Sequence, residues 1–181
     1  MKKLTQILFG LLMGAFVLTF ASCANTTDGT TESTSSSSSS DAYLPSEFSS
    51  ETISALYTGE MEESFDGSSY VITRAVYFFE SKAFVVTDSI SGEVSGAQQV
   101  IKVPVFKGTY ELSGTFTNGT ISLTYTHYYS ETNSGSLVWK EFSDDDDLSE
   151  LPTELKVSGG KVTVPMSSLT DEETNVTFTK Q

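Results

Sequence analysis

The chain has 181 residues, enough for one ordinary domain with an extension, and it carries 10 Lys and Arg against 24 Asp and Glu, a formal charge of −14. An acidic surface repels phosphate groups, so nucleic acid is excluded as an expected partner. The single Cys provides no disulfide, whereas 12 Phe, 8 Tyr and 1 Trp supply the aromatic area that a packed core needs.

Residues 1–22 have the pattern of a secretory signal peptide. Two lysines near the N-terminus precede an uncharged apolar run over residues 7–20, and the small residues Ala21 and Ser22 stand directly before Cys23. The apolar run is shorter than the roughly 18 residues of a membrane-spanning helix. A cleaved leader is therefore favoured over an uncleaved anchor, and a plain signal peptide with an incidental Cys is the other alternative.

The segment 18–23 (Leu-Thr-Phe-Ala-Ser-Cys) resembles the lipoprotein box of bacterial lipoproteins. In that family two small residues and a Cys direct diacylglycerol transfer to the thiol and cleavage just before it. The resemblance implies that Cys23 is acylated, becomes the first mature residue and binds the protein to membrane lipid. Ala24 stands where an Asp would retain an enteric-type lipoprotein at the inner membrane, so the resemblance implies a place in the cell envelope at the outer membrane. Cleavage would leave 8 Lys and Arg against 24 Asp and Glu, a formal charge of −16.

Residues 23–42 are expected to form a flexible tether behind the acylated Cys. The stretch from Asn25 to Ser40 contains no aliphatic or aromatic residue and ends in a run of Ser. Such a composition cannot bury enough apolar surface to offset the entropy of ordering. The folded domain is therefore expected over residues 43–181.

The domain is predicted to be all-β, because runs rich in Val, Ile, Thr, Tyr and Phe alternate with turn residues. The expected strands are 53–60, 69–80, 82–88, 97–106, 108–117, 119–129, 136–142, 154–158, 161–165 and 174–180. Asn118-Gly119 and Gly159-Gly160 are typical of two-residue hairpin turns. We expect an antiparallel up-and-down meander of about 8–10 strands closed into a barrel, which would remove its edges. A two-sheet β-sandwich is the alternative.

Two hairpins carry a second resemblance. Residues 108–114 (Gly-Thr-Tyr-Glu-Leu-Ser-Gly) with 118–125, and residues 155–164 with 176–180, resemble the hairpins and last strands of bacterial lipocalin-like (calycin) lipoproteins. The resemblance extends over most of residues 44–181 and implies a lipocalin-like barrel. The Gly-x-Trp motif of true lipocalins is missing from the first predicted strand.

Strand alternation predicts which side chains face the interior. It places Ile121, Leu123, Tyr125, His127 and Tyr129 on one inward face, and it also directs Tyr110 with Leu112 and Leu137 with Trp139 inward. The candidate ligand-binding residues are Arg74, Tyr110, Leu123, Tyr125, His127 and Trp139.

Arg74 and His127 are the polar members of this candidate set. Arg74 shares a face with Tyr70, Ile72, Val76 and Phe78, so an internal ion pair is favoured over an anchor for an acidic ligand. In the opposite register, which directs residues 71, 73, 75, 77 and 79 inward, Arg74 would lie in solvent. His127 is interpreted as a hydrogen-bonded residue at the barrel end rather than a ligand contact.

The sequence predicts neither an enzyme nor a metal or cofactor site. The chain has one His, and it contains no Gly-x-Ser-x-Gly or phosphate-loop motif. The acidic run 144–147 does not follow a calcium-loop pattern, because the sixth position is Ser149 and the twelfth is Leu155. A solvated loop is favoured over a weak divalent-ion site.

Two function classes remain. The first is an envelope lipoprotein whose acidic β domain binds another envelope protein through acidic loops and exposed aromatic residues such as Tyr128 and Tyr129. The second is a lipocalin-like carrier that holds a small apolar ligand in the barrel interior. A barrel filled by large side chains would favour the first class, and a dry cavity would favour the second.

Overall fold

The computed structural model describes residues 42–65, 68–94, 97–132, 136–143, 145–167 and 173–181. The predicted signal peptide 1–22, Cys23 and all of the predicted tether except Ala42 lie outside these described residues. Within the described ranges, no helix is both long enough and apolar enough to cross a membrane.

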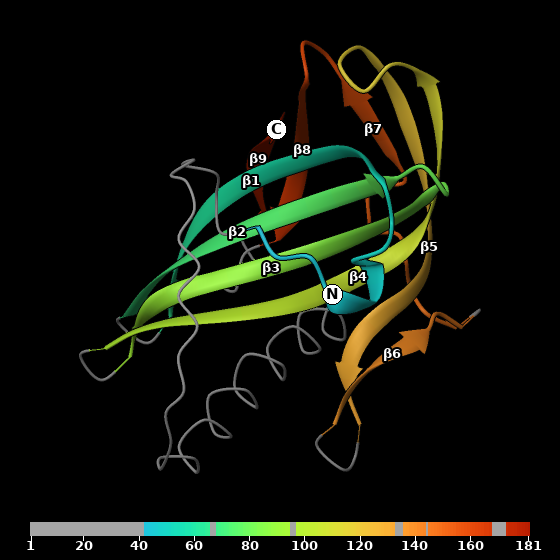
Figure 1. Ribbon diagram of the computed structural model, residues 1–181. Helices are drawn as coiled ribbons and strands as arrows, with labels where there is room; N and C mark the ends of the chain where they lie inside the picture. The colour runs from blue at the N-terminus through green and yellow to red at the C-terminus, as the bar shows by residue number, and fades with distance from the viewer. Residues whose placement is uncertain (1–41, 66–67, 95–96, 133–135, 144, 168–172) are drawn as a thin grey trace, which may run out of the picture.

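The described chain forms one antiparallel sheet (Figure 1). Its strands are β1 (Ile53–Phe65), β2 (Ser68–Phe79), β3 (Ala83–Val94), β4 (Ala97–Gly114), β5 (Gly119–Glu131), β6 (Leu137–Glu141), β7 (Glu154–Val157), β8 (Lys161–Ser167) and β9 (Glu173–Lys180). A 3₁₀ helix, η2 (Ser46–Phe48), precedes them. The strand order is β6-β5-β4-β3-β2-β1-β9-β8, with β7 paired to β5. The all-β antiparallel meander is therefore confirmed.

The two strands predicted at 97–106 and 108–117 are a single strand, β4. Gly108 lies inside it and not at a turn. A Cβ at this position would lie 2.0 Å from the backbone O of Thr124, so only glycine lets β5 approach β4 this closely. Gly108 therefore does not separate two strands, but lies where the backbones of β4 and β5 are in close contact.

Closure into a barrel is not confirmed. β7 and β8 are joined by a turn at which Ser158 bridges Lys161, and no described residues beyond this turn pair the two strands. β9 pairs with β1 only at Tyr57↔Lys180 and Thr58↔Thr179. The described sheet is open, and this arrangement also fits the two-sheet sandwich that was the alternative.

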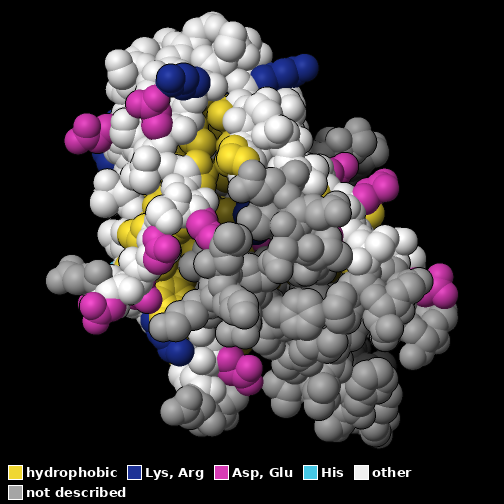
Figure 2. Space-filling model, turned by 180° about the vertical axis from the view of Figure 1, so that it is seen from behind, with side chains coloured by type: hydrophobic (Ala, Val, Ile, Leu, Met, Phe, Trp, Pro, Cys, Tyr) yellow, Lys and Arg dark blue, Asp and Glu magenta, His cyan; other side chains and the backbone are white. Residues whose placement is uncertain are grey.

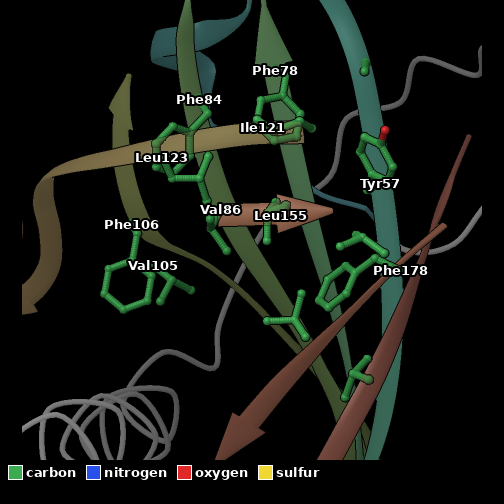
Figure 3. Packing of buried hydrophobic residues seen from close by; sticks show 14 of the residues in the cluster. Tyr57, Phe78, Phe84, Val86, Val105, Phe106, Ile121, Leu123, Leu155 and Phe178 are labelled. Carbon is green, nitrogen blue, oxygen red and sulfur yellow. The ribbon is translucent and has the colours of Figure 1, made fainter. Parts of the chain in front are cut away.

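The hairpin of β8 and β9 covers part of the concave side of the sheet, which we call the inner face. A Cβ on Gly59 of β1 would lie 2.9 Å from Cγ1 of Val176 and 3.1 Å from the ring of Phe178, both on β9. Figure 3 shows Leu155 and Phe178 approaching this face from β7 and β9. The core therefore lies between the curved sheet and its own C-terminal strands.

Aromatic side chains fill the centre of the inner face. The ring of Phe78 lies 4.9 Å from Tyr110, 5.5 Å from Phe116 and 5.9 Å from Tyr57, measured between centroids. Phe78 and Tyr57 are almost completely buried. Edge-to-face and tilted contacts of this kind add to the free energy gained from burial alone.

The convex side of the sheet, which we call the outer face, has a second apolar cluster. Its buried members are Ala75, Tyr77, Phe79 and Val85. The segment 42–48, which we call the strap, lies across β2 and β3 on this side (Figure 1). The ring of Phe48 stacks on Phe79 at 5.4 Å, and the Thr87 hydroxyl donates to the carbonyl of Tyr43 at 2.7 Å. The sheet is thus covered on both sides near its middle.

Candidate functional site

The predicted Arg74 ion pair is present on the inner face. Arg74 of β2 stands opposite Gly59 of β1 and Asp88 of β3. Its Nε donates to Oδ1 of Asp88 at 2.7 Å, and its Nη2 donates to Oδ2 at 2.7 Å. The side chains are 18% and 3% exposed, respectively. This two-point contact matches the planar guanidinium to the planar carboxylate and neutralises both charges.

The surroundings of Arg74 keep it charged. Burial alone would lower the pKa of Arg74, but the charge and hydrogen bonds of Asp88 outweigh burial and raise it. Burial also raises the pKa of the nearby Tyr125 phenol, and the positive charge of Arg74 opposes that rise. Because Asp88 already neutralises the guanidinium, the geometry favours a structural ion pair over an anchor for an acidic ligand.

Three other candidates, Tyr110, Leu123 and Tyr125, lie on the inner face as expected. The Tyr110 hydroxyl donates to the carbonyl of Phe79 at 2.8 Å, and the Tyr125 hydroxyl donates to that of Pro152 at 3.1 Å. Tyr110 and Leu123 are buried. Both tyrosine hydroxyl groups thus have a backbone partner within the protein, which is the usual role of such groups in a packed core.

His127 does not share the face of Tyr125, and here the sequence-based assignment is wrong. Lys107 pairs with His127 while the next residue, Gly108, pairs with Tyr125, so Thr126 is an extra residue in β5. Such a bulge reverses the alternation of side chains beyond it. Tyr128 therefore packs on the inner core, whereas His127 and Tyr129 lie on the other side.

The contacts of His127 are local. Its Nδ1 lies 2.9 Å from the Thr126 hydroxyl, and its Nε2 lies 3.9 Å from Oε1 of Glu141. The side chain is partly exposed, while the Glu141 side chain is 84% exposed. These contacts agree with a hydrogen-bonded residue outside the interior.

Trp139, which was also expected to line the interior, packs instead against the outer cluster. Its Nε1 donates to Oε1 of Glu47 in the strap at 2.6 Å. The Lys107 ammonium lies 4.5 Å from the centre of its ring, and the Tyr129 ring meets it edge-on at 5.1 Å. Trp139 therefore joins β6 to the strap, because the bulge in β5 places the face of Tyr129 and Trp139 outward.

The acidic segment after β6 makes hydrogen bonds to its own serines. Oδ2 of Asp146 accepts from the backbone N–H and the hydroxyl of Ser143, at 2.7 and 2.9 Å. Oδ1 of Asp147 accepts from the N–H of Ser149 at 3.0 Å, and hydrogen bonds from the side chain and then the backbone of Ser149 lower the pKa of Asp147. No group of three or more metal-ligating side chains was found among the described residues, which do not include Asp144.

β6 forms one edge of the described sheet. Leu137 and Val138 on this strand are 40% and 37% exposed. An edge strand presents unpaired backbone groups, and exposed apolar side chains beside them are typical of a binding surface. Sequence reasoning did not single out this edge, because strand order is a property of the fold.

Sequence reasoning also missed Asp88 and the strap. Asp88 was detectable in principle, since it is the lone carboxylate within the apolar segment 83–90. The strap carried the weaker signal of two apolar residues, Leu44 and Phe48, around a turn-forming Pro45.

No protein-family model, curated protein or solved structure matches this chain.

Proposed function

We propose that the protein is an exported, membrane-anchored lipoprotein whose acidic β domain binds another protein of the cell envelope through its surface. The anchor rests on the leader and on Cys23, whose acyl chains would attach the domain to membrane lipid at the outer membrane. Two or more acyl chains hold a protein on a membrane durably, whereas one chain holds it only marginally.

The packed interior is the observation that favours surface binding over ligand carriage. Phe78, Tyr110 and Phe116 meet at the centre of the inner face with ring centroids 4.9 to 5.8 Å apart. Leu155 and Phe178 are also buried in this core. A barrel-like domain filled by its own large side chains offers its surface for recognition.

Carriage of a small apolar ligand is the second candidate, and one observation favours it. Figure 2 shows hydrophobic side chains gathered in a hollow of the molecule, with Asp and Glu side chains beside it. A ligand in this hollow would meet apolar side chains, as in most small-molecule sites. In this second candidate function, the sheet would close into a barrel around the ligand.

Metabolic labelling with palmitate tests the anchor. In a bacterial host that processes lipoproteins, we expect the wild-type chain to take up label and the Cys23→Ser variant to take up none. The Ser22→Ala variant keeps a small residue before the Cys and should label like the wild type. An unlabelled wild-type chain, recovered without its leader, would contradict the proposal.

A further inference from the structure

We propose that the free edge of β6 binds an extended peptide segment with alternating apolar and basic residues, which pairs with β6 as an additional antiparallel strand. This inference rests on the proposed function and names the kind of partner that the surface fits. Addition of a strand to a sheet edge is a recurrent mode of peptide recognition, in which backbone hydrogen bonds give affinity and side chains give specificity.

The hydrogen bonds of β6 show which backbone groups are directed away from the sheet. The Thr132 N–H donates to the Ser136 carbonyl at 2.7 Å, and the Phe142 N–H donates to the Thr126 carbonyl at 3.0 Å. The even-numbered residues from 136 to 142 therefore direct their backbone N–H and C=O groups toward β5. Because the direction alternates along a strand, those of Leu137, Trp139 and Glu141 are directed outward. Among the described strands, none pairs with this side of β6.

The other end of the sheet lacks the same capacity. In β8, the Lys161 N–H donates to the Ser158 carbonyl at 3.0 Å, so the backbone groups of Thr163 and residue 165 are directed to the same outer side. Residue 165 is a proline and has no N–H to donate. A proline on an edge strand is a common means of preventing strand addition. The outward positions of β6 contain no proline.

A lysine can also protect an edge, but Lys140 of β6 is held elsewhere. Its Nζ donates to the Glu131 carbonyl at 3.0 Å and to the Ser130 hydroxyl at 3.4 Å, both at the end of β5. Lys140 is thus bound within the sheet. The exposed side chains Leu137 and Val138 remain beside the outward backbone groups, one on each side of the strand.

Charge selects a basic partner. The Glu141 side chain is 84% exposed at the end of the edge, and the whole chain has a formal charge of −14. A second copy of this chain would bring the same negative charge to the interface, whereas lysines in the added strand would be attracted to it. Apolar residues of that strand would lie beside Leu137 and Val138.

The single tryptophan of the chain, Trp139, lies on β6 and reports binding by its fluorescence. The full chain, purified in mild detergent, is titrated with a capped peptide of alternating Val and Lys and with a matched peptide of alternating Val and Glu. We expect saturable binding of the Val-Lys peptide and little binding of the Val-Glu peptide. Equal binding of both, or of neither, would overturn the inference.

A matched pair of variants locates the contact. Leu137→Ala shortens the side chain and keeps the outward N–H, whereas Leu137→Pro also removes that N–H, without removing one directed to β5. Loss of one interfacial hydrogen bond should weaken binding by about tenfold in Leu137→Pro relative to Leu137→Ala. Equal affinity of the two variants would place the peptide elsewhere.

Amide hydrogen exchange of the wild type keeps the test decisive if Leu137→Pro does not fold. Peptide binding should slow exchange at Trp139 and Glu141, while Val138 and Lys140 are already bonded to β5. Light scattering without peptide is the last measurement. A dimer that Leu137→Pro disperses would show that the edge pairs with a second copy, contrary to the inference. If the peptide does not bind but Cys23 is labelled by palmitate, this inference is overturned and the proposed membrane anchor is retained.

Discussion

At the scale of single residues, the Arg74–Asp88 pair balances charge on an otherwise apolar face. Both hydrogen bonds between the two side chains are 2.7 Å long, and Asp88 is 3% exposed. A buried pair is of limited value relative to apolar side chains of the same size, but removal of one partner leaves an uncompensated charge. Removal of one partner is therefore expected to cost more stability than the intact pair contributes.

Removal of one partner should be costly. We expect Asp88→Ala to lower the free energy of unfolding by about 3 kcal/mol, because Arg74 would be left without its carboxylate. Urea denaturation followed by circular dichroism measures this change. The exposed pair Lys156–Glu154, at 3.6 Å, is the matched control, and Glu154→Gln should cost about 0–1 kcal/mol. A similarly small loss in Asp88→Ala would show that the guanidinium is not buried.

Buried tyrosines make the domain sensitive to alkali. Burial raises the pKa of Tyr57 to about 12, and its hydroxyl donates to the carbonyl of Phe116. The folded pKa lies above the unfolded value of about 10, so the stabilisation is complete below pH 10 and is lost as the pH rises toward 12.

The urea concentration at the unfolding midpoint should therefore decrease as the pH is raised from about 9 to about 11.5, across the unfolded pKa of about 10. The Tyr57→Phe variant should be less stable at pH 9, because the Phe116 carbonyl loses its donor, and it should show a shallower decline with pH. Parallel pH profiles for the two proteins would show that Tyr57 titrates normally. Tyr77, whose pKa burial also raises, contributes in the same direction in both proteins.

The environment of Arg74 could be predicted from the sequence, whereas its pairing with Asp88 could not, although Asp88 stands out as the lone carboxylate of the apolar segment 83–90. The alternation of Tyr70, Ile72 and Phe78 around Arg74 identified its face correctly, because side-chain period is a property of one strand. Asp88 became its neighbour through the register between β2 and β3, which depends on the whole sheet.

At the scale of the elements, one extra residue decides the fate of two candidate site residues. The bulge at Thr126 places His127 and Tyr129 opposite to Tyr125, and Trp139 follows Tyr129 through the pairing with β6. Alternation predicted the faces of β5 correctly as far as Tyr125. A bulge leaves no clear mark in Thr-Tyr-Thr-His, so the assignment was wrong beyond it.

The strap is an element whose attachment can be monitored. Glu47→Ala removes the carboxylate that accepts from Trp139 Nε1 at 2.6 Å, so we expect the emission of Trp139 to shift to longer wavelength as water reaches the indole. Steady-state fluorescence of the single Trp measures the shift. Glu51→Ala is the control, because Glu51 accepts from Ser81 at 2.8 Å and should leave the emission unchanged. Identical spectra for all three proteins would mean that the strap does not contact Trp139.

The crossing of β9 over β1 gives a second test at this scale. Gly59→Ala would place a Cβ 2.9 Å from Val176, so we expect a loss of about 1–3 kcal/mol from overpacking. In the double variant with Val176→Ala the two costs should be less than additive, because the smaller side chain makes room. Strict additivity in urea denaturation would show that β9 does not lie over Gly59.

At the scale of the whole molecule, the sequence pattern predicted the all-β antiparallel meander but not whether the sheet closes into a barrel. Alternating runs and turn residues predicted an antiparallel all-β meander, since local pattern decides each strand, and the sheet follows chain order from β1 to β6. Beyond β6 the order departs from a simple meander, because β7 pairs with β5 and β9 pairs with β1. Whether the last strands close a barrel or cover a face depends on how the ends of the sheet meet. The open edges are the result, and one of them is the proposed peptide site.

In the proposed function, the protein is an acylated envelope protein with a filled interior and a binding surface. Native mass spectrometry of the protein, extracted in mild detergent from a host that processes lipoproteins, tests this most directly. We expect the mass of residues 23–181 with acyl chains on Cys23 and no additional bound small molecule. An unmodified Cys23 would contradict the anchor, and a reproducible bound mass that disappears in Tyr125→Ala would contradict the filled interior and favour ligand carriage.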